Sequence, residues 1–134
     1  MAGYSGTPLA KKLGIKEGAT LAWVNAPAKF EDLLDPLPDE VTIKPRLGPG
    51  LDVVVAFFTE AAAVATRLPA LTEAIFPAGG LWIAWPKRAS GVPTDITEQT
   101  IRDIALPTGL VDNKVCAVDD TWSGLRLVVR KENR

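Results

Sequence analysis

Apolar positions along the chain follow two periods, that of a buried strand and that of an amphipathic helix. Residues 51–58 (LDVVVAFF) are apolar on both alternating faces, which is typical of a strand buried on both sides of a parallel sheet. Residues 60–76 carry apolar side chains at spacings of four, three and four, which places them on one helical face. These are Val64, Leu68, Leu71 and Ile75. The pattern predicts a buried strand followed by a crossover helix.

Pro69 lies inside this helical pattern, where proline cannot donate to the preceding turn. We expect a kink, or two short helices joined near Arg67 and Leu68.

Further strands and helices alternate along the rest of the chain. Strands are expected at residues 20–25, 41–44, 81–85, 115–118 and 125–129, and a short helix at 29–34. A later helix should begin at a capping box formed by Asp95 and Glu98 and end at Pro107 and Gly109. Residues 1–19 form an N-terminal arm with a short helix.

The order of these elements predicts a single α/β domain over residues 1–134. Strands that alternate with helices favour an open, mostly parallel, Rossmann-like sheet with helices on both faces. The turn at 119–124 is too short for a crossover helix, so the last two strands should form a C-terminal antiparallel hairpin.

Charge and composition narrow the class of protein. The 134 residues contain 15 Lys and Arg against 16 Asp and Glu, with a net charge of −1 and no long basic run, which argues against nucleic-acid binding. We find no secretory leader and no apolar run long enough for a membrane span. The lone Cys116 excludes an internal disulfide and fits a reducing compartment, so we expect a cytoplasmic protein.

The chain contains no histidine, which removes the commonest general base and zinc ligand. Serine–histidine and cysteine–histidine enzymes are therefore excluded, and no metal site is predicted. Cys116 sits between apolar residues of a strand and should behave as a small hydrophobic side chain. The sequence assigns no catalytic residue.

The loop at residues 87–95 carries the most polar chemistry near a strand end. It leaves the carboxyl end of the strand at 81–85, where open α/β sheets bind ligands. Lys87 and Arg88 would neutralise an anion, while Ser90 and Thr94 would orient it and Asp95 begins a helix. Asn25, at the end of the first strand, would join this site. An exposed loop with a capped helix start is the structural alternative.

The hairpin turn offers a second surface, with Asp120 and Trp122 as candidates for contact with a partner or cation. Asp and Gly are also common turn residues, which is the structural alternative. Three other tryptophans lie in expected strands and should pack in the core: Trp23, Trp82 and Trp85.

Three segments resemble an uncharacterised bacterial family, a domain of unknown function (DUF3052-like). They are AGYSGTPL at residues 2–9, GGLWIAWPK at 79–87, and LVDNKVC at 110–116 with TWSGLR at 121–126. The resemblance spans almost the whole chain and implies kinship without an assigned activity.

The order of strands and helices is more distantly similar to Rossmann-like methyltransferases that use S-adenosylmethionine (SAM). Those enzymes place a glycine-rich turn after the first strand, whereas residues 24–28 read VNAPA. An acidic residue is also missing after the second strand, where residues 44–46 read KPR. This departure favours a scaffold that has lost its cofactor site.

The leading hypothesis is therefore a non-enzymatic regulatory or protein-interaction domain with no cofactor, on a reduced methyltransferase-like scaffold. Its partner would be an unknown protein or a small anionic ligand. The alternative is a transferase that binds SAM or a nucleotide through a non-standard cofactor loop. The chain is expected to be a monomer or a homodimer paired through the hairpin or an edge strand.

Overall fold

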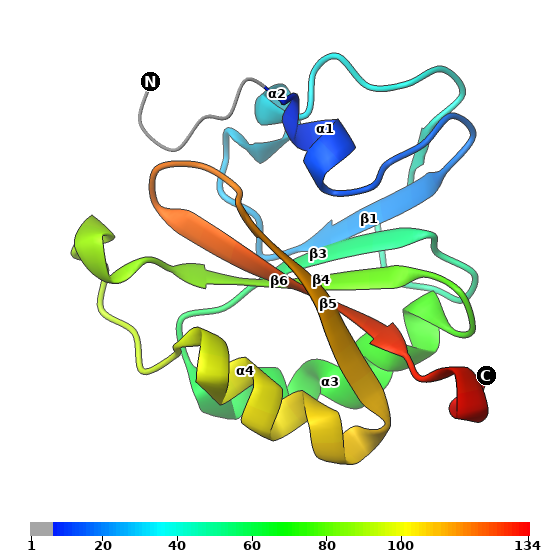
Figure 1. Ribbon diagram of the computed structural model, residues 1–134. Helices are drawn as coiled ribbons and strands as arrows, with labels where there is room; N and C mark the ends of the chain where they lie inside the picture. Colours follow the sequence, from blue (N-terminus) through cyan, green and yellow to red (C-terminus); the bar gives the residue numbers. More distant parts are fainter. Residues whose placement is uncertain (1–6) are drawn as a thin grey trace.

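The computed structural model describes residues 7–134, and all its strands belong to one sheet. Residues 1–6, which open the expected arm and carry part of the bacterial resemblance, lie outside the described residues. The sheet has six strands in the order β2-β1-β3-β4-β6-β5 (Figure 1).

Four strands pair with one another in parallel, and the last two strands form antiparallel pairs, with β6 alone running against the others. The parallel strands are β1 (Thr20–Val24), β2 (Thr42–Ile43), β3 (Val53–Phe57) and β4 (Gly80–Pro86). The hairpin consists of β5 (Leu110–Ala117) and β6 (Trp122–Val129), and β6 pairs with β4. The mostly parallel, Rossmann-like α/β sheet with a C-terminal antiparallel hairpin is confirmed.

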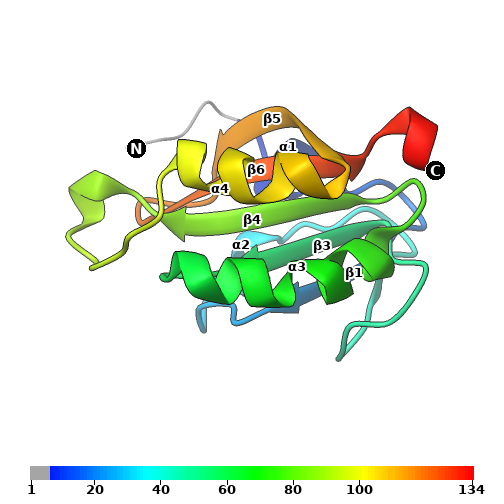
Figure 2. The same cartoon turned by 90° about the horizontal axis from the view of Figure 1, so that it is seen from below.

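Two helices cover one face of the sheet. α3 (Ala61–Ile75) and α4 (Glu98–Ala105) lie side by side along it, as Figure 2 shows. Every residue of β3 and β4 is buried, because apolar layers pack against both faces. Arg102 on α4 ties this layer to the edge strand, since its Nε lies 2.9 Å from an Asp112 oxygen of β5. Both charged groups are partly exposed, so this ion pair contributes little stability.

The opposite face is covered by α1 (Leu9–Lys12), α2 (Phe30–Leu33) and the segments that follow them. Trp82 of β4 is fully buried here, and its indole N–H donates to the Leu13 carbonyl at 2.9 Å. This bond satisfies the one polar atom of a large apolar side chain. The end of the N-terminal arm therefore forms part of the core of its own sheet.

Pro69 does not divide α3 into two helices, so that alternative of the expectation was wrong, while the kink stays a prediction. The helix runs from Ala61 to Ile75 with Pro69 inside it. Pro69 removes the donor that would pair with the Ala65 carbonyl, and both residues are exposed. Water can donate a hydrogen bond to the carbonyl of the exposed Ala65, so the helix continues despite the missing internal hydrogen bond.

Three short 3-10 helices complete the described chain: η1 (Arg88–Ser90), η2 (Leu106–Thr108) and η3 (Lys131–Asn133). Gly109 ends η2 with φ of 95°, in the left-handed region where glycine is favoured. Within residues 7–134, no helix is both long and apolar enough to cross a membrane.

Candidate functional site

The carboxyl ends of the parallel strands define one edge of the sheet. The strand order reverses between β1 and β3, since β2 lies beyond β1 and β4 lies beyond β3. Open α/β sheets bind ligands outside the carboxyl ends of strands at such a switch point. A cavity of about 290 Å³ occurs there. It is lined by Asn25, Phe57, Phe58, Thr59, Glu60, Ala63 and Trp122.

Asn25 forms the turn that leaves β1, and its backbone has φ of 58°. This left-handed conformation is rare for residues other than glycine, but asparagine tolerates it better than most side chains. The side-chain amide donates to the Phe57 carbonyl at 3.3 Å, which joins the ends of β1 and β3. The turn therefore has a glycine-like backbone at one position although it contains no glycine.

A row of four aromatic rings includes two that line this cavity, Phe57 and Trp122. Trp23 meets Phe30 at 5.3 Å between ring centroids, Phe30 meets Phe57 at 5.0 Å, and Phe57 meets Trp122 at 5.1 Å, each edge to face. Such contacts are favourable beyond the area that they bury. The row links β1, α2, β3 and β6, and its last two rings, Phe57 and Trp122, form part of the cavity lining.

A larger cleft, of about 580 Å³, lies at the carboxyl end of β4. Of the predicted site residues, Lys87, Arg88, Thr94 and Asp95 line it, whereas Ser90 does not. Asn25 lines the smaller cavity instead. The Thr94 hydroxyl donates to the Thr59 carbonyl at 2.7 Å. Because Thr59 lines the smaller cavity, this hydrogen bond connects the 87–95 loop with that cavity.

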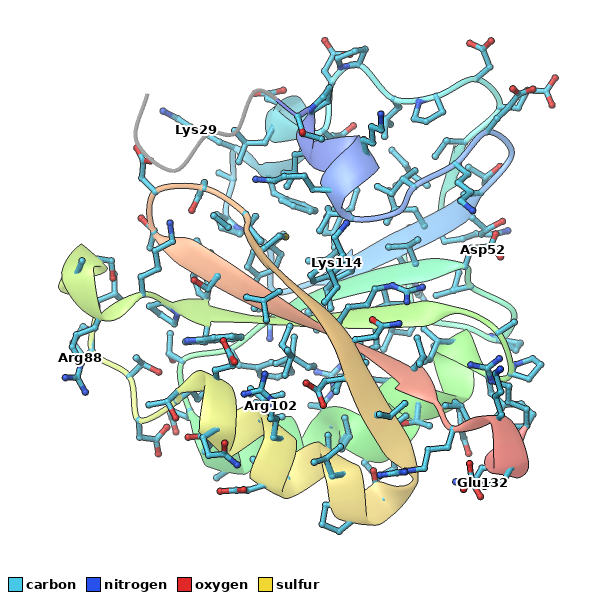
Figure 3. All side chains as sticks on the ribbon, in the orientation of Figure 1. Lys29, Asp52, Arg88, Arg102, Lys114 and Glu132 are labelled. Carbon is cyan, nitrogen blue, oxygen red and sulfur yellow. The ribbon has the colours of Figure 1, made fainter. Side chains whose placement is uncertain are left out.

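Most polar groups of the 87–95 loop are engaged within the protein. The Lys87 ammonium donates to the Asp119 carbonyl at 2.7 Å, and the Ser90 hydroxyl donates to the Lys87 carbonyl at 2.6 Å. Arg88 differs, because it is exposed and makes no side-chain hydrogen bond or ion pair with any residue of the 7–134 range. Figure 3 shows Arg88 at the outer end of the loop, directed away from the sheet. It is the cation of this loop that remains free to meet an anion.

Asp95 stabilises α3 and not the helix that follows it. Its carboxylate accepts a hydrogen bond from the Ala61 N–H at 2.8 Å, in the first turn of α3. The capping box of α4 is formed by Thr97 and Thr100. The predicted capping box of Asp95 and Glu98 was therefore wrong, because a contact distant in sequence takes the Asp95 carboxylate.

The hairpin turn separates its two predicted interaction residues. The Asp119 carboxylate accepts from the N–H groups of Thr121 and Trp122, which fixes the turn. Trp122 faces the cavity at the switch point, while Asp120 is exposed at the tip. Trp82 and Trp85 pack in the core, and Trp23 is only partly buried.

Glu60 and Thr59 were missed from the sequence. Both follow β3 after Phe58 and line the cavity beside Asn25. Glu60 is exposed, and its backbone is extended at the start of α3 with no side-chain cap bond. Their position just after a buried strand was the available signal, since this is where parallel strands present ligand-binding side chains.

Solved structures resemble the chain along nearly its whole length. A SAM-dependent methyltransferase from Aquifex aeolicus is 17% identical and has a TM-score of 0.64, with 90% of this chain and 88% of that one covered. A putative type 11 methyltransferase from Sulfolobus solfataricus is 11% identical, with a TM-score of 0.61 and coverage of 92% and 90%. The chain has the methyltransferase fold.

A structure with bound ligand is among these neighbours. Magnesium protoporphyrin IX methyltransferase from Synechocystis PCC 6803, with bound SAM, is 11% identical. Its TM-score is 0.56, and the match covers 91% of this chain and 74% of that one. No family model and no curated protein matches the sequence.

These neighbours contradict the leading hypothesis of a non-enzymatic domain without a cofactor. The three neighbours named above are all methyltransferases or putative methyltransferases, one of them is SAM-dependent by name, and one holds SAM. The hypothesis relied on the missing glycine after β1. That argument was weak, because Asn25 supplies the left-handed backbone for which glycine is usually chosen.

Proposed function

We propose that this α/β domain binds SAM or a related nucleoside at the switch-point cavity and acts as a transferase. The observation that carries the proposal is the position of this cavity between the ends of β1 and β3, beside the left-handed turn at Asn25. The methyltransferase fold of the neighbours supports the same ligand class.

The side chains around the cavity fit a cationic nucleoside in chemical type. Glu60 offers a carboxylate that would accept hydrogen bonds from ribose hydroxyls or an ammonium group. Trp122 and Phe57 offer aromatic surface, which suits both a purine ring and a sulfonium cation. No acidic residue follows β2, where Lys44 stands, so Glu60 would be the acidic group of the site.

The volume of the cavity limits how such a ligand can bind. At about 290 Å³ it lies at the lower end of the roughly 300–1,000 Å³ typical of ligand pockets. We therefore expect only part of the ligand to be enclosed, with the remainder along the edge towards the 580 Å³ cleft. In this arrangement Arg88 would meet an anionic acceptor substrate, and Lys87, Ser90, Thr94 and Asp95 would hold the loop in place.

SAM supplies an electrophilic methyl group on sulfur, so the protein need only bind and orient the two substrates. The absence of histidine from the sequence is compatible with such a reaction. Kinship with the uncharacterised bacterial family and a cytoplasmic location belong to the same proposal, and rest on the sequence motifs and the lone cysteine.

Calorimetric titration with SAM and S-adenosylhomocysteine tests the proposal. We expect saturable binding and a rise in thermal stability that corresponds to about 2.7 kcal/mol at a ligand concentration 100 times the Kd. Glu60→Gln and Trp122→Ala should weaken binding roughly tenfold or more, since each removes one contact of about 1.4 kcal/mol. The Asp120→Asn variant, changed at the exposed turn tip, is the matched control and should bind as the parent does.

The absence of any heat or stabilisation with both ligands would overturn the proposal. Equal binding by the parent, Glu60→Gln and Trp122→Ala would place the ligand elsewhere on the molecule.

A further inference from the structure

Arg126 stands out at the other end of the sheet as a half-buried cation without an acidic partner. It belongs to β6, where it lies opposite Trp82 of β4 and Lys114 of β5. Across residues 7–134, its guanidinium makes no hydrogen bond, ion pair or aromatic stacking contact that meets ordinary distance limits. Charged groups that leave water are normally paired, so an arginine in this state calls for an explanation.

Gly80 leaves open the space that this guanidinium occupies. A methyl group added at Gly80 would come 2.6 Å from Arg126 Nε and 2.8 Å from Cζ. The guanidinium therefore rests on the backbone at the start of β4, in space that any other residue at position 80 would fill. The side chain of Arg126 therefore extends from β6 over β4, and its charged end lies on the side of β3.

The guanidinium contributes to a cavity of about 350 Å³ at the amino ends of the parallel strands. The cavity lies between the turn that follows α1, the start of β3 and the turn before β4. It is lined by Gly14, Lys16, Glu17, Gly18, Ala19, Asp52, Val53, Ala78 and Arg126. Figure 3 shows Asp52 and Arg88 at opposite ends of the sheet, so this cavity is separate from the proposed cofactor edge.

Two cations and two carboxylates line the cavity, namely Arg126, Lys16, Asp52 and Glu17, and none of them forms an ion pair with any residue of the 7–134 range. Lys16 adds a second cation, while Asp52 uses one carboxylate oxygen to accept from the Thr20 N–H at 2.8 Å. Asp52 and Arg126 line the same space without forming an ion pair. Burial lowers the pKa of Arg126, and the charge of Arg134 lowers it further. An anion beside the guanidinium would relieve both effects.

We infer that this cavity binds a small organic anion, whose carboxylate or phosphate group pairs with Arg126 and Lys16 and whose neighbouring hydroxyl donates to Asp52. A guanidinium presents a planar fork of donors that matches both anionic groups. The requirement for a donor follows from the two carboxylates of the lining, Glu17 and the free oxygen of Asp52, which would repel an anion that lacked one. The inference is independent of SAM binding, because the two sites share no residue.

Two probes distinguish the sources of the anion: L-malate for a hydroxycarboxylate and glycerol 3-phosphate for a phosphate monoester. Each is titrated into the ¹⁵N-labelled chain against sodium chloride at matched ionic strength. We expect at least one probe to shift the amide signals of Gly18, Ala19 and Asp52 and the Nε–H signal of Arg126 in a saturable way. The chloride series should leave them unchanged.

Variants then test whether the charge of Arg126 binds the anion. Arg126→Gln should raise the Kd roughly tenfold or more, because it removes a charge-assisted contact. Arg126→Lys should retain part of the affinity. Lys114→Gln is the matched control, since Lys114 faces Arg126 across the strand pair but its ammonium bonds the Lys12 carbonyl outside the cavity lining. Its affinity should stay within about twofold of the parent, as expected for a screened surface charge.

The inference is overturned if neither probe shifts these signals in the parent chain, if chloride shifts them equally, or if Arg126→Gln binds as the parent does. The labelled parent chain gives the first two results without any variant, so poor folding of Arg126→Gln does not leave the question open. Calorimetry with SAM in the same samples reports on the other edge separately.

Discussion

Gly79 lies in the turn between α3 and β4, where neighbouring carbonyl groups leave no room for a side chain. A Cβ at this position would approach the Ile75 carbonyl oxygen to 2.9 Å and the Leu51 carbonyl oxygen more closely still. These are backbone atoms, so relief requires a shift of α3 or β3. We predict that Gly79→Ala lowers the free energy of unfolding by about 1–3 kcal/mol, measured by urea denaturation.

Gly48→Ala is the control for this prediction. No atom lies within 4 Å of a Cβ built at Gly48, which sits in a loop. Its stability should stay within about 0.5 kcal/mol of the parent. Equal effects of the two substitutions would mean that backbone crowding at Gly79 is not the cause.

Cys116 gives a pH-dependent prediction at the same scale. Burial raises the pKa of its thiol above the ordinary value of 9.0, and the charges of Lys12 and Lys114 only partly oppose this. The neutral thiol is therefore favoured in the folded chain, while the unfolded chain ionises first as pH rises. This contribution to stability is complete below about pH 9 and is lost as pH rises through the raised pKa.

The comparison of parent and Cys116→Ala from pH 7 to pH 10.5 measures this effect. We expect the parent to lose stability faster than the variant above about pH 9. Parallel pH profiles would show that the thiol does not ionise differently in the two states.

Residue types at the candidate site could be predicted from the sequence, but their partners could not. Lys87, Arg88, Thr94 and Asp95 do gather around one cleft, as their position after β4 indicated. Their hydrogen bonds depend on residues about 30 positions away, such as Asp119 and Thr59, which no local pattern reveals. The left-handed backbone of Asn25 was equally hidden, since asparagine adopts it in only a minority of cases.

Among the elements, α3 depends on a cap supplied from outside its own segment. The Asp95 carboxylate accepts from the Ala61 N–H, 34 positions earlier in the chain. We predict that Asp95→Ala lowers the free energy of unfolding by about 1 kcal/mol, as loss of a helix cap usually does. Asp95→Asn keeps an acceptor oxygen and should cost less.

Asp120→Ala serves as the control here, because Asp120 is an exposed carboxylate at a turn tip. Stability losses of the same size in Asp95→Ala and Asp120→Ala would argue for a general effect of charge. Chemical denaturation at pH 7 measures all three variants.

Most elements were predictable because their signals are local. The run of apolar residues at 51–58 became β3, and the four-three-four spacing became α3. β5 begins at Leu110, earlier than the expected residue 115, because polar positions such as the half-buried Asp112 and the exposed Lys114 obscure the strand pattern. Pairing with β6, and not hydrophobicity, holds that part of the strand.

Over the whole molecule, the segment around α1 is the least expected contributor to stability. Leu13 is fully buried against the second face of the sheet, and its carbonyl accepts the indole N–H of Trp82. We predict that Leu13→Ala costs about 2–5 kcal/mol of unfolding free energy, since it opens a cavity in that layer. Thermal and urea unfolding should agree on the size of the loss.

Lys11→Ala provides the comparison, because Lys11 is exposed on the same short helix. Its effect should be within about 0.5 kcal/mol. A small effect of Leu13→Ala would show that the segment around α1 is an accessory arm, as the short-helix pattern of residues 1–19 first indicated.

The strand order carries a consequence for synthesis on the ribosome. Of the six strands, β6 is made last, yet it lies between β4 and β5. A nascent chain that has reached Ala117 already holds β4, buried along its whole length in the finished protein, with one open edge and no neighbour for β5. Unpaired apolar strand edges promote aggregation. The growing chain is therefore aggregation-prone until β6 emerges and pairs with both β4 and β5.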